Sequence, residues 1–348
     1  MRKKVEYSKK QIEKAGRKIV DESITPEEYV ECKYIIDNWR AAHAFPMNTF
    51  AINLKRQVGD IDDGIVVQRL KRLSTIEDKL KRFPEMSLYR MQDLGGCRVI
   101  LPSIEDVYRV KKKFQESYIR HKLVNEKDYI AIPNPNTGYR GVHLIYKYYS
   151  DRRDDYNGLL VEIQIRSKTQ HLWATAVETV GIFTQNGLKF NQGSEEWLRF
   201  FKLVSALFSI EEQSAVVDGV STNPQIIIEE LIRIMNKLQV IKKLFAIGLA
   251  TSRWGRIQKS KTPGYYLMEL NTKDHTLSVT KFTNADRATN EYNKIELRKD
   301  QYIDVVLVSA QSFEALTHAY PNYFANIKEF MDVLFGIIDK YSPKKIRS

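Results

Sequence analysis

The sequence predicts an α/β protein with a mixed β-sheet flanked by helices and a small C-terminal α+β module. Strand-like apolar runs alternate with helical patterns along the middle of the chain, which is typical of a mixed sheet with covered faces. The 348 residues suffice for about two domains, and a hydrophobic fraction of 43% is ample for a packed core. The formal net charge of +12 favours polyanionic partners such as nucleotides or RNA.

The N-terminal part is predicted to be helical. Its first twenty residues are rich in Lys and Arg and have the pattern of a basic amphipathic helix. Thr25 and Pro26 begin a second helix, because Thr is a good N-cap and Pro is accommodated at the first helical position. This helix reaches residue 44, and a further helical stretch covers residues 47–58.

The rest of the chain alternates strands and helices. Strands are expected at residues 66–72, 97–101, 142–149, 159–166, 265–270, 277–282 and 302–308. Helices are expected at residues 74–83, 103–118, 169–183, 195–245, 285–296 and 312–339, and a loop at 251–264. The chain then divides into N-terminal helices (1–60), an α/β core (61–190), a helical connector (191–250) and a C-terminal module (251–348).

Composition also limits the compartment and the kind of site. Cys32 and Cys97 form no CxxC pair, which argues against a disulfide scaffold or a cysteine-type zinc site and suits a reducing compartment. The N-terminus lacks the apolar core of a signal peptide, and no apolar run approaches a membrane span. We therefore expect a cytoplasmic protein with no membrane partner. Glycine-rich phosphate loops are absent, so side chains must hold the phosphates of any bound nucleotide.

A first cluster of suitable side chains comprises Arg69, Lys71 and Arg72, followed by Lys79. An Arg plane can stack on a base, while Lys acts as a point charge on phosphate. The alternative is a solvated charged face, which is common for runs of charge.

A second cluster is the segment MQDLGGCRVI at residues 91–100. Asp93 could hold a hard cation such as Mg²⁺ through oxygen. Gly95 and Gly96, at the mouth of a predicted strand, would let the backbone pass close to a ligand. The alternative for Asp93 is an ordinary turn residue before a strand.

A third cluster is the strand-like segment LVEIQIR at residues 160–166. Because side chains alternate along a strand, Glu162, Gln164 and Arg166 share one face, and the other face is purely apolar. Such polar groups on an inner strand need water or a ligand, although salt bridges on the sheet surface are the alternative.

The loop between these clusters, residues 128–143, is rich in Pro, Asn and Gly and should be rigid. It presents Tyr139 between Gly138 and Arg140, where the ring could stack on a base. His143 enters the following strand, where a purely structural role is the alternative.

Taken together, these segments resemble the synthetase domain of RelA/SpoT homologues. RLKRLSTIEDKL, MQDLGGCRVI, KDYIAIPNPNTGYRGVH and VEIQIRSKTQHLWATAVE occur in this order, and the resemblance covers residues 60 to 185. It implies a Mg²⁺-dependent pyrophosphokinase, because the family transfers pyrophosphate from ATP to a ribose 3′-hydroxyl.

The resemblance also implies a role for individual residues. On the ATP side, Arg69 and Arg98 resemble the family's arginines that sandwich adenine, and Lys71 and Lys79 would lie along the phosphates. Asp93 and Glu162 resemble its Mg²⁺-binding acids, and Glu162, helped by Gln164, would polarise the attacking hydroxyl. On the acceptor side, Tyr139 would stack on the base, with His143 near the acceptor phosphates and Arg166 in the same subsite.

The acceptor loop departs from the family pattern P-K-P-N-G-Y-[RQ]-S-[LI]-H. Asn134 stands where the family has a lysine, Thr137 is an extra residue, and Gly141 replaces a serine. Loss of a lysine beside the acceptor pocket argues against a free guanosine di- or triphosphate as the acceptor.

The C-terminal module, with Tyr320 and Tyr323 in a Y-x-x-Y arrangement, resembles that of CapRel-type fused toxin–antitoxins. Those enzymes pyrophosphorylate the 3′ end of tRNA, which stops translation, and their C-terminal domain inhibits them until a phage capsid protein binds. The resemblance implies the same autoinhibition here, with Tyr320 and Tyr323 as the latch and a phage-encoded trigger protein as partner. Pro321 should break the predicted helix at this point.

Two other functions remain open. One is a small alarmone synthetase that makes guanosine or adenosine tetra- and pentaphosphates, (p)ppGpp or (p)ppApp, from ATP and a free nucleotide. The other is a catalytically inactive RNA-binding module, which the intact acids and Tyr139 disfavour. DNA is not expected as a partner.

Overall fold

The computed structural model describes residues 4–59, 61–187, 194–244, 253–257, 259–271, 273–274, 276–298, 300, 302–310, 312–319 and 327–342. Its strands are β1 (Ile65–Leu70), β2 (Gly95–Leu101), β3 (Lys122–Asp128), β4 (Val142–Lys147), β5 (Leu160–Ser167), β6 (Arg253–Ile257), β7 (Gly264–Asn271), β8 (Thr276–Phe282) and β9 (Ile303–Ala310). Its α-helices are α1 (Lys9–Lys18), α2 (Pro26–Ala42), α3 (Ala44–Val58), α4 (Leu73–Arg82), α5 (Ile104–Glu116), α6 (Lys168–Gly187), α7 (Ser194–Glu211), α8 (Pro224–Leu238), α10 (Ala285–Leu297), α11 (Phe313–Ala319) and α13 (Ile327–Tyr341).

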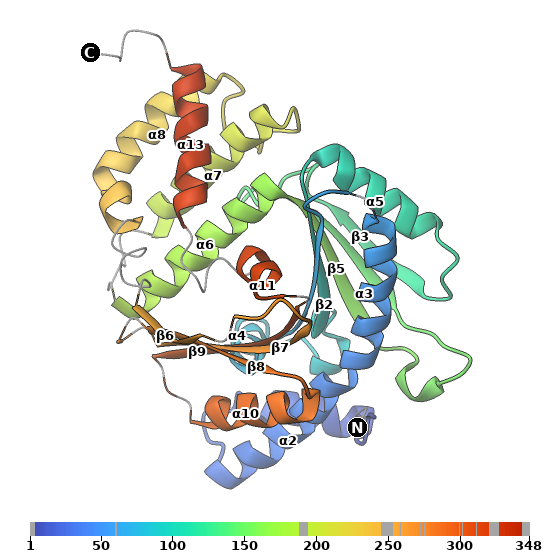
Figure 1. The fold of residues 1–348 in the computed structure, drawn as a ribbon. Helices are drawn as coiled ribbons and strands as arrows, with labels where there is room; N and C mark the ends of the chain where they lie inside the picture. The colour runs from blue at the N-terminus through green and yellow to red at the C-terminus, as the bar shows by residue number, and fades with distance from the viewer. Residues whose placement is uncertain are drawn as a thin grey trace.

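The strands form one nine-stranded mixed sheet in the order β3-β4-β5-β2-β1-β9-β7-β8-β6 (Figure 1). At its centre, β2 and β5 run parallel, and β1 and β4 flank them antiparallel. The C-terminal strands continue this sheet, because β9 pairs with β1 through Gln68↔Ser309 and Arg69↔Val308. The mixed α/β fold expected from the sequence is confirmed, and the C-terminal part shares its sheet with the central part.

Helices α3 and α5 pack on the apolar face of the central strands, and α1, α2 and α4 contribute side chains to the same core. Cys97 and Val99 of β2 and Ile163 of β5 point to this face and pack in one core with Phe50 of α3 and Phe114 of α5. All five side chains are almost completely buried. Burial of this face explains why Val161, Ile163 and Ile165 of β5 are apolar.

The opposite, polar face of the central sheet is covered by α6 on one side and α11 on the other (Figure 1). Leu316 of α11 packs on Val67 and Ile100. Helix α6 joins α7, α8 and α13 in a separate helical core, in which Phe330 of α13 contacts Phe208 of α7. The functional side chains predicted on β1, β2 and β5 therefore lie between α6 and α11.

Helix starts follow the local signals. Thr25 caps α2 in a capping box with Glu28, and Pro26 is its first residue, as predicted. Ser103 caps α5 through the backbone of Asp106. In the first twenty residues the helix is shorter than predicted, because it begins only after Ser8, which forms a capping box of its own.

Three parts of the secondary-structure prediction are wrong. Strand β3 was not predicted, because its sequence KLVNEKD is mostly polar and lies exposed at the sheet edge. Strand β6 lies within the predicted loop 251–264. The helical stretch predicted at 195–245 is interrupted: α7 ends at Glu211, and Asn223 and Pro224 start α8; both residues are ordinary helix-start signals.

The long C-terminal helix predicted at 312–339 is represented by α11 and α13. Ile327, Phe330 and Leu334 are among the buried residues of α13. Tyr320, Pro321 and Tyr323 lie outside the described residues, so the predicted helix break and latch stay predictions.

Cys32 and Cys97 are both free and buried. Across the described ranges, no helix combines the length and the apolar character needed to cross a membrane.

Candidate functional site

A cavity of about 370 Å³ opens on the polar face of the sheet, over β1, β2 and β5. It is lined by Arg69, Lys71, Arg72, Thr75, Asp93, Gly96, Cys97, Arg98, Glu162, Gln164, Arg166 and Glu178. Five of these side chains are cationic and three are acidic. The excess of positive charge suits an anionic ligand.

Strand register creates this cavity. Gly96 of β2 lies opposite Arg69 of β1 and opposite Glu162 of β5. The three residues form one row across the sheet, and the glycine in the middle has no side chain to fill the space between the guanidinium and the carboxylate. In the next row, Arg98 lies beside Gln164.

Asp93, in the turn before β2, is held by two lysines. Lys71 Nζ lies 2.8 Å from its Oδ2, and Lys79 Nζ lies 3.0 Å from its Oδ1. Burial by itself would raise the pKa of Asp93, but the two ammonium groups hold it below its usual value. The carboxylate is therefore ionised at neutral pH, and a cation or phosphate that enters would exchange partners with this triad.

Glu162 is held from two sides by its neighbours on the sheet. His143 Nδ1 lies 3.0 Å from Oε1, and Gln164 Nε2 donates to Oε2 at 2.8 Å. Burial raises the pKa of Glu162 and so does the charge of Asp93, but the contacts from His143 and Gln164 bring the net shift below the usual value. The site thus keeps both carboxylates charged.

Five side chains close a ring of hydrogen bonds. Arg166 donates from Nη2 to Gln164 Oε1 at 2.9 Å and from Nε to the Tyr139 hydroxyl at 3.1 Å. The same hydroxyl lies 2.5 Å from His143 Nε2. A neutral imidazole with its proton on Nδ1 satisfies every member, because Nδ1 then donates to Glu162 and Nε2 accepts from Tyr139.

The loop that carries Tyr139 is tightly built. The Tyr139 ring meets Tyr129 edge-on at 5.5 Å, and the Arg166 guanidinium lies 5.1 Å from its centroid. Gly141 has φ +150°, and a Cβ there would lie 3.1 Å from both Arg166 Cγ and the Tyr139 hydroxyl. Glycine at position 141, in place of the family's serine, is therefore the residue that fits this arrangement.

Helix α7 and the residues after it support this loop. Arg140 is buried and binds Glu212 and the Ser214 hydroxyl, the latter at 2.7 Å. Ser205 donates its hydroxyl to the Gly138 carbonyl at 2.5 Å. The position of Tyr139 thus depends on a helix outside the sheet.

Glu178 of α6 lines the cavity and was missed by the sequence reasoning. Burial opposes its ionisation, but the charges of Arg98 and Arg69, followed by Arg166 and Arg72, lower its pKa. One signal was present in the sequence: after Lys168, Glu178 is the only Asp, Glu, Lys or Arg in α6. A lone carboxylate in an otherwise uncharged helix indicates a cationic neighbour.

The sequence-predicted site residues of the core converge. Arg69, Lys71, Asp93, Arg98, Glu162, Gln164 and Arg166 line the cavity, and Lys79, Tyr139 and His143 contact them directly.

The expectation that both glycines face a ligand is wrong for Gly95. A Cβ on Gly95 would lie 2.8 Å from His43 Cβ and 2.9 Å from Met47 Sδ. Gly95 therefore allows close packing of the segment around α3 against the apolar face of the sheet. Of the two glycines, Gly96 lines the cavity and Gly95 does not.

The acids of the cavity fit a role as Mg²⁺ ligands. Asp93 and Glu162 both line it, and the charge of one raises the pKa of the other. No cluster of three or more His, Cys, Asp or Glu residues that could hold a metal occurs within the described residues. Mg²⁺ typically takes one or two carboxylates and completes its shell with substrate phosphates and water, so two acids suffice.

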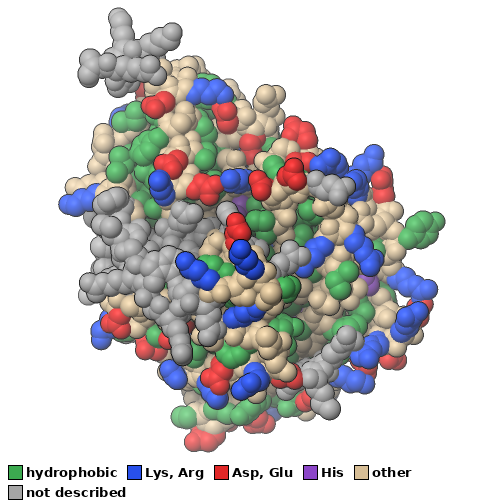
Figure 2. Space-filling view, viewed as in Figure 1, with side chains coloured by type: hydrophobic (Ala, Val, Ile, Leu, Met, Phe, Trp, Pro, Cys, Tyr) green, Lys and Arg blue, Asp and Glu red, His purple; other side chains and the backbone are tan. Residues whose placement is uncertain are grey.

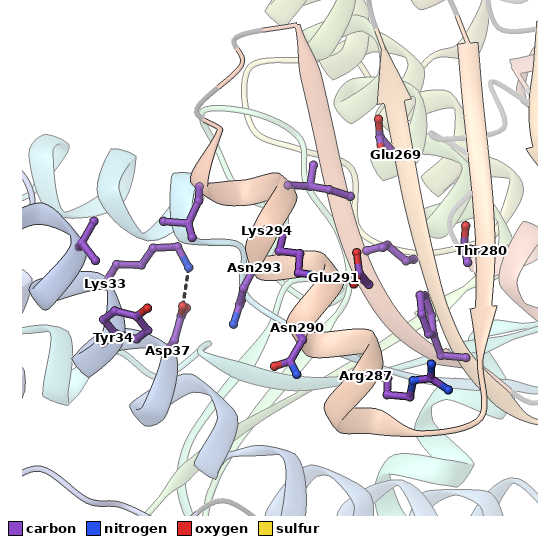
Figure 3. Close-up of a pocket in the computed structure, with 15 residues that line it drawn as sticks. Lys33, Tyr34, Asp37, Glu269, Thr280, Arg287, Asn290, Glu291, Asn293 and Lys294 are labelled. Atoms are coloured by element: carbon purple, nitrogen blue, oxygen red, sulfur yellow. Dashed lines mark hydrogen bonds and ion pairs between the residues drawn. The ribbon is translucent and has the colours of Figure 1, made fainter. Parts of the chain in front are cut away.

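A larger cavity, of about 760 Å³, lies between α2, α10 and the strands β7 and β8 (Figure 3). Its polar lining mixes cations such as Lys33 and Arg287 with acids such as Asp37 and Glu269. None of the sequence-predicted site residues lines it. The smaller, cationic cavity is therefore the candidate site.

Residues 68–185 match a family described as a region found in RelA / SpoT proteins. The chain contains a RelA/SpoT region. This region spans β1 to α6 and holds every residue that lines the candidate cavity. The resemblance inferred from the four motifs is thereby confirmed for the core, while the likeness of the C-terminal part to CapRel-type proteins is not confirmed.

Two curated relatives of the chain are from Bacillus subtilis (strain 168). GTP pyrophosphokinase YjbM is 32% identical over 114 residues, which is 32% of this chain and 52% of that protein. GTP pyrophosphokinase YwaC is 33% identical over 112 residues, 31% of this chain and 52% of that protein. The chain spans about half the length of the curated relatives it matches. The crystal structure of small alarmone synthetase 1 from Bacillus subtilis aligns with 52% of this chain and 91% of that one, at 23% identity and a TM-score of 0.41.

The hydrogen-bonded ring predicts the effect of removing one hydroxyl. Tyr139→Phe leaves Arg166 Nε and His143 Nε2 without their shared partner, so we expect the free energy of unfolding to fall by roughly 1–2 kcal/mol. Urea denaturation measures this change. The control is Tyr129→Phe, whose ring touches Tyr139 and which should unfold like the wild type. Equal stability of both variants would show that the ring of hydrogen bonds does not form in solution.

Proposed function

We propose that this chain is an ATP-dependent pyrophosphokinase of the RelA/SpoT type, which moves pyrophosphate from ATP to a ribose 3′-hydroxyl and leaves AMP. One observation carries the proposal: a single cavity in the RelA/SpoT region holds three carboxylates, Asp93 and Glu162 among them, together with five Arg and Lys side chains. Such transfer depends on positioning and charge neutralisation more than on covalent chemistry. The relatives named GTP pyrophosphokinase support the same reaction class.

ATP binds on the β1–β2 side of the cavity in this proposal. Arg69 and Arg98 lie on neighbouring strands and line the same space, which suits guanidinium planes stacking on a base. Lys71 and Lys79 would take the phosphates. Their present partner is Asp93, and an entering triphosphate offers them the same kind of charge.

The acceptor binds on the β5–β4 side. Glu162 would polarise the attacking hydroxyl, with Gln164 orienting its carboxylate through the 2.8 Å hydrogen bond. Tyr139 and His143 would contact the acceptor nucleotide beside Arg166. The ring of hydrogen bonds favours this division, because it fixes these groups before a substrate arrives and so limits reorganisation during transfer.

Asp93 and Glu162 would hold Mg²⁺. When bound, Mg²⁺ supplies charge neutralisation at the transferring phosphates. Glu162 has partners on both carboxylate oxygens, which keep it ionised and aimed into the cavity.

We propose the tRNA 3′ end as the acceptor, which would make the enzyme an inhibitor of translation. Asn134, which replaces the family's lysine, turns inward: its side-chain oxygen accepts from the backbone amides of Asn136 and Thr137. It therefore brings no cation to polyphosphate. RNA contacts would come from dispersed Lys and Arg, which are interspersed with Asp and Glu on the face seen in Figure 2.

The second candidate function is a small alarmone synthetase that uses a free nucleotide as acceptor, giving (p)ppGpp or (p)ppApp. The names of the two curated relatives favour it. The cationic cavity would serve either acceptor.

We further propose that the C-terminal part inhibits the enzyme through Tyr320 and Tyr323 and that a phage-encoded protein, such as a capsid protein, releases it. The supporting observation is that α11, which ends immediately before Tyr320, packs on the same face of the sheet as the cavity. An inhibited state favoured by a few kcal/mol is enough for such a switch.

Charge removal tests the metal and base assignments. Glu162→Gln and Asp93→Asn keep the side-chain shape but lose the charge, so pyrophosphate transfer should fall by roughly 100-fold or more. Labelled ATP followed by chromatography measures the product, and circular dichroism checks the fold. Glu116→Gln on the exposed surface of α5 is the matched control. Wild-type activity in either test variant would refute the assignment.

The acceptor can be identified by incubating the protein with labelled ATP and either total tRNA or free GTP. We expect labelled tRNA, and a steep loss of labelling with added salt, because phosphate contacts release counterions. Reversing the exposed Lys9 and Lys10 should weaken tRNA labelling further, while reversing Lys112 and Lys113 serves as control. Conversion of GTP without labelling of tRNA would establish the alarmone reaction instead.

The latch is tested by Tyr320→Ala combined with Tyr323→Ala. Loss of the inhibitory contact should raise basal pyrophosphate transfer in the absence of any trigger. Tyr118→Ala, which alters a fully exposed ring, is the control. A folded double variant with unchanged basal activity would show that these tyrosines are not the latch.

A further inference from the structure

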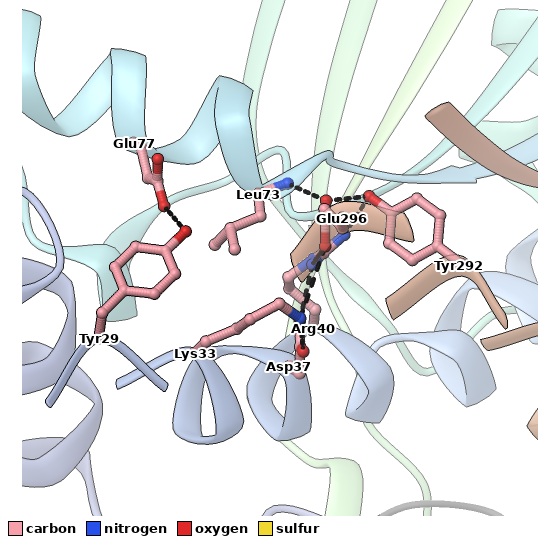
Figure 4. A network of polar contacts seen from close by, with 8 residues as sticks. All are labelled: Tyr29, Lys33, Asp37, Arg40, Leu73, Glu77, Tyr292 and Glu296. Atoms are coloured by element: carbon pink, nitrogen blue, oxygen red, sulfur yellow. Dashed lines mark hydrogen bonds and ion pairs between the residues drawn. The ribbon is translucent and has the colours of Figure 1, made fainter. Parts of the chain in front are cut away.

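A buried cluster of charges joins α10 of the C-terminal part to α2 (Figure 4). Arg40 Nη1 lies 3.2 Å from Glu296 Oε2 and 2.8 Å from Asp37 Oδ1, and Lys33 also contacts both acids. The side chains of Lys33, Arg40 and Glu296 are less than 10% exposed. Two cations balance two acids, so the cluster is neutral as a whole.

One carboxylate oxygen of this cluster, Glu296 Oε1, also contacts helix α4. The backbone amide of Leu73, the first residue of α4, donates to Glu296 Oε1 at 3.0 Å. Helix α4 has no side-chain cap of its own and no acidic residue in its first turn. Glu296, 223 positions away in sequence, therefore supplies both the acceptor and the negative charge that a helix N-terminus favours.

The carboxylate is held in place for this contact. The Tyr292 hydroxyl donates to Glu296 Oε1 and accepts from Arg40 Nη2 at 3.0 Å. Burial opposes ionisation of Glu296, but Arg40 and its hydrogen bonds bring the pKa below the usual value. The cap is thus a fixed, charged group.

Helix α4 leads directly to the candidate site. Lys71 and Arg72 precede it and line the cavity together with Thr75 of its first turn. Lys79, in its last turn, holds Asp93. Its other side is apolar and buried, through Leu73, Ile76 and Leu80. A shift of α4 would therefore move Lys71 and Lys79 relative to Asp93.

We propose that Glu296 is a positioning residue for ATP: by capping α4 it sets where Lys71 and Lys79 meet the phosphates, and it makes α10 a component of the ATP subsite. The inference rests on the proposed function, because it concerns the same cavity. Buried ion pairs are often replaceable by apolar groups without loss of stability, so the specific contribution of Glu296 is its oxygen on the Leu73 amide.

Two double variants separate this contribution from stability. Arg40→Gln with Glu296→Gln, the Gln pair, removes one buried cation and one buried acid but keeps an oxygen at position 296. Arg40→Met with Glu296→Met, the Met pair, removes the same charges and that oxygen, with side chains of similar volume. Both leave Lys33 balanced by Asp37. The control is Glu291→Gln on the same helix, in a pair exposed to solvent.

Three quantities are measured: amide hydrogen exchange of residues 73–80, with α5 as internal reference; the dissociation constant of a non-hydrolysable ATP analogue; and kcat and KM for ATP. The Met pair should exchange about five- to tenfold faster in α4 than the Gln pair, the effect of losing one cap. Its dissociation constant and KM should rise by a similar factor, with a smaller change in kcat. The Gln pair keeps the oxygen on the Leu73 amide but lacks the negative charge, so it should lie between the wild type and the Met pair.

Equal α4 exchange and equal ATP affinity in the two pairs would overturn the inference, whatever their stability. If the Met pair does not fold, Glu296→Asp makes the same comparison, since it keeps the charge but withdraws the oxygens from Leu73. A wild-type protein that binds no ATP analogue would defeat the proposed function, and the exchange comparison would still decide whether Glu296 holds α4.

Discussion

The parallel pairing of β2 with β5 is the constraint on which the candidate site depends. Its register sets Gly96 between Arg69 and Glu162 and leaves the space that becomes the cavity. A slip of one residue would turn Glu162 and its neighbours on β5 into the apolar core. The buried side chains on the other face, such as Ile163, prevent that slip, because they would then face the cavity. Packing on the apolar face of the sheet thus determines which side chains line the cavity on the polar face.

Charge balance is the second organising feature. The acids of the cavity pair with some of its cations and leave an excess of positive charge: Asp93 binds two lysines, and Glu178 lies among arginines. The part of the cavity around Asp93 differs from the part around Glu162 in how its side chains are held. The lysines have a carboxylate partner that phosphate can replace, whereas Glu162 belongs to a closed ring of hydrogen bonds that favours one geometry. The lysines around Asp93 can therefore exchange their partner, whereas the side chains around Glu162 keep a fixed orientation.

The features of the fold and of the site that could be predicted are those that depend on residues close together in the sequence. The alternation in residues 160–166 predicted the polar face of β5, and the resemblance of the four motifs to RelA/SpoT synthetases predicted the residues that converge on the cavity. Pairing partners are not local. Nothing near β9 in sequence shows that it joins β1, and nothing near α4 shows that its cap is Glu296. Tyr139 was predicted as a stacking ring, but the engagement of its hydroxyl needs the register of β4 and β5, which only the fold supplies.

The C-terminal part contacts the strand and helix that carry the proposed ATP-binding residues, and two of these contacts flank Lys71. Val308 pairs with Arg69 on β1, and Glu296 binds the Leu73 amide, so the segment that carries Lys71 is held from both ends. The acceptor loop depends on α7, which packs against α13. A ligand acts on such a system only by binding one arrangement better than another. Because misplacement of groups by about 1 Å can cost about 100-fold in rate, the proposed inhibition by the C-terminal part does not require that this part cover the cavity: a change in how it supports α4 and the loop that carries Tyr139 would be sufficient.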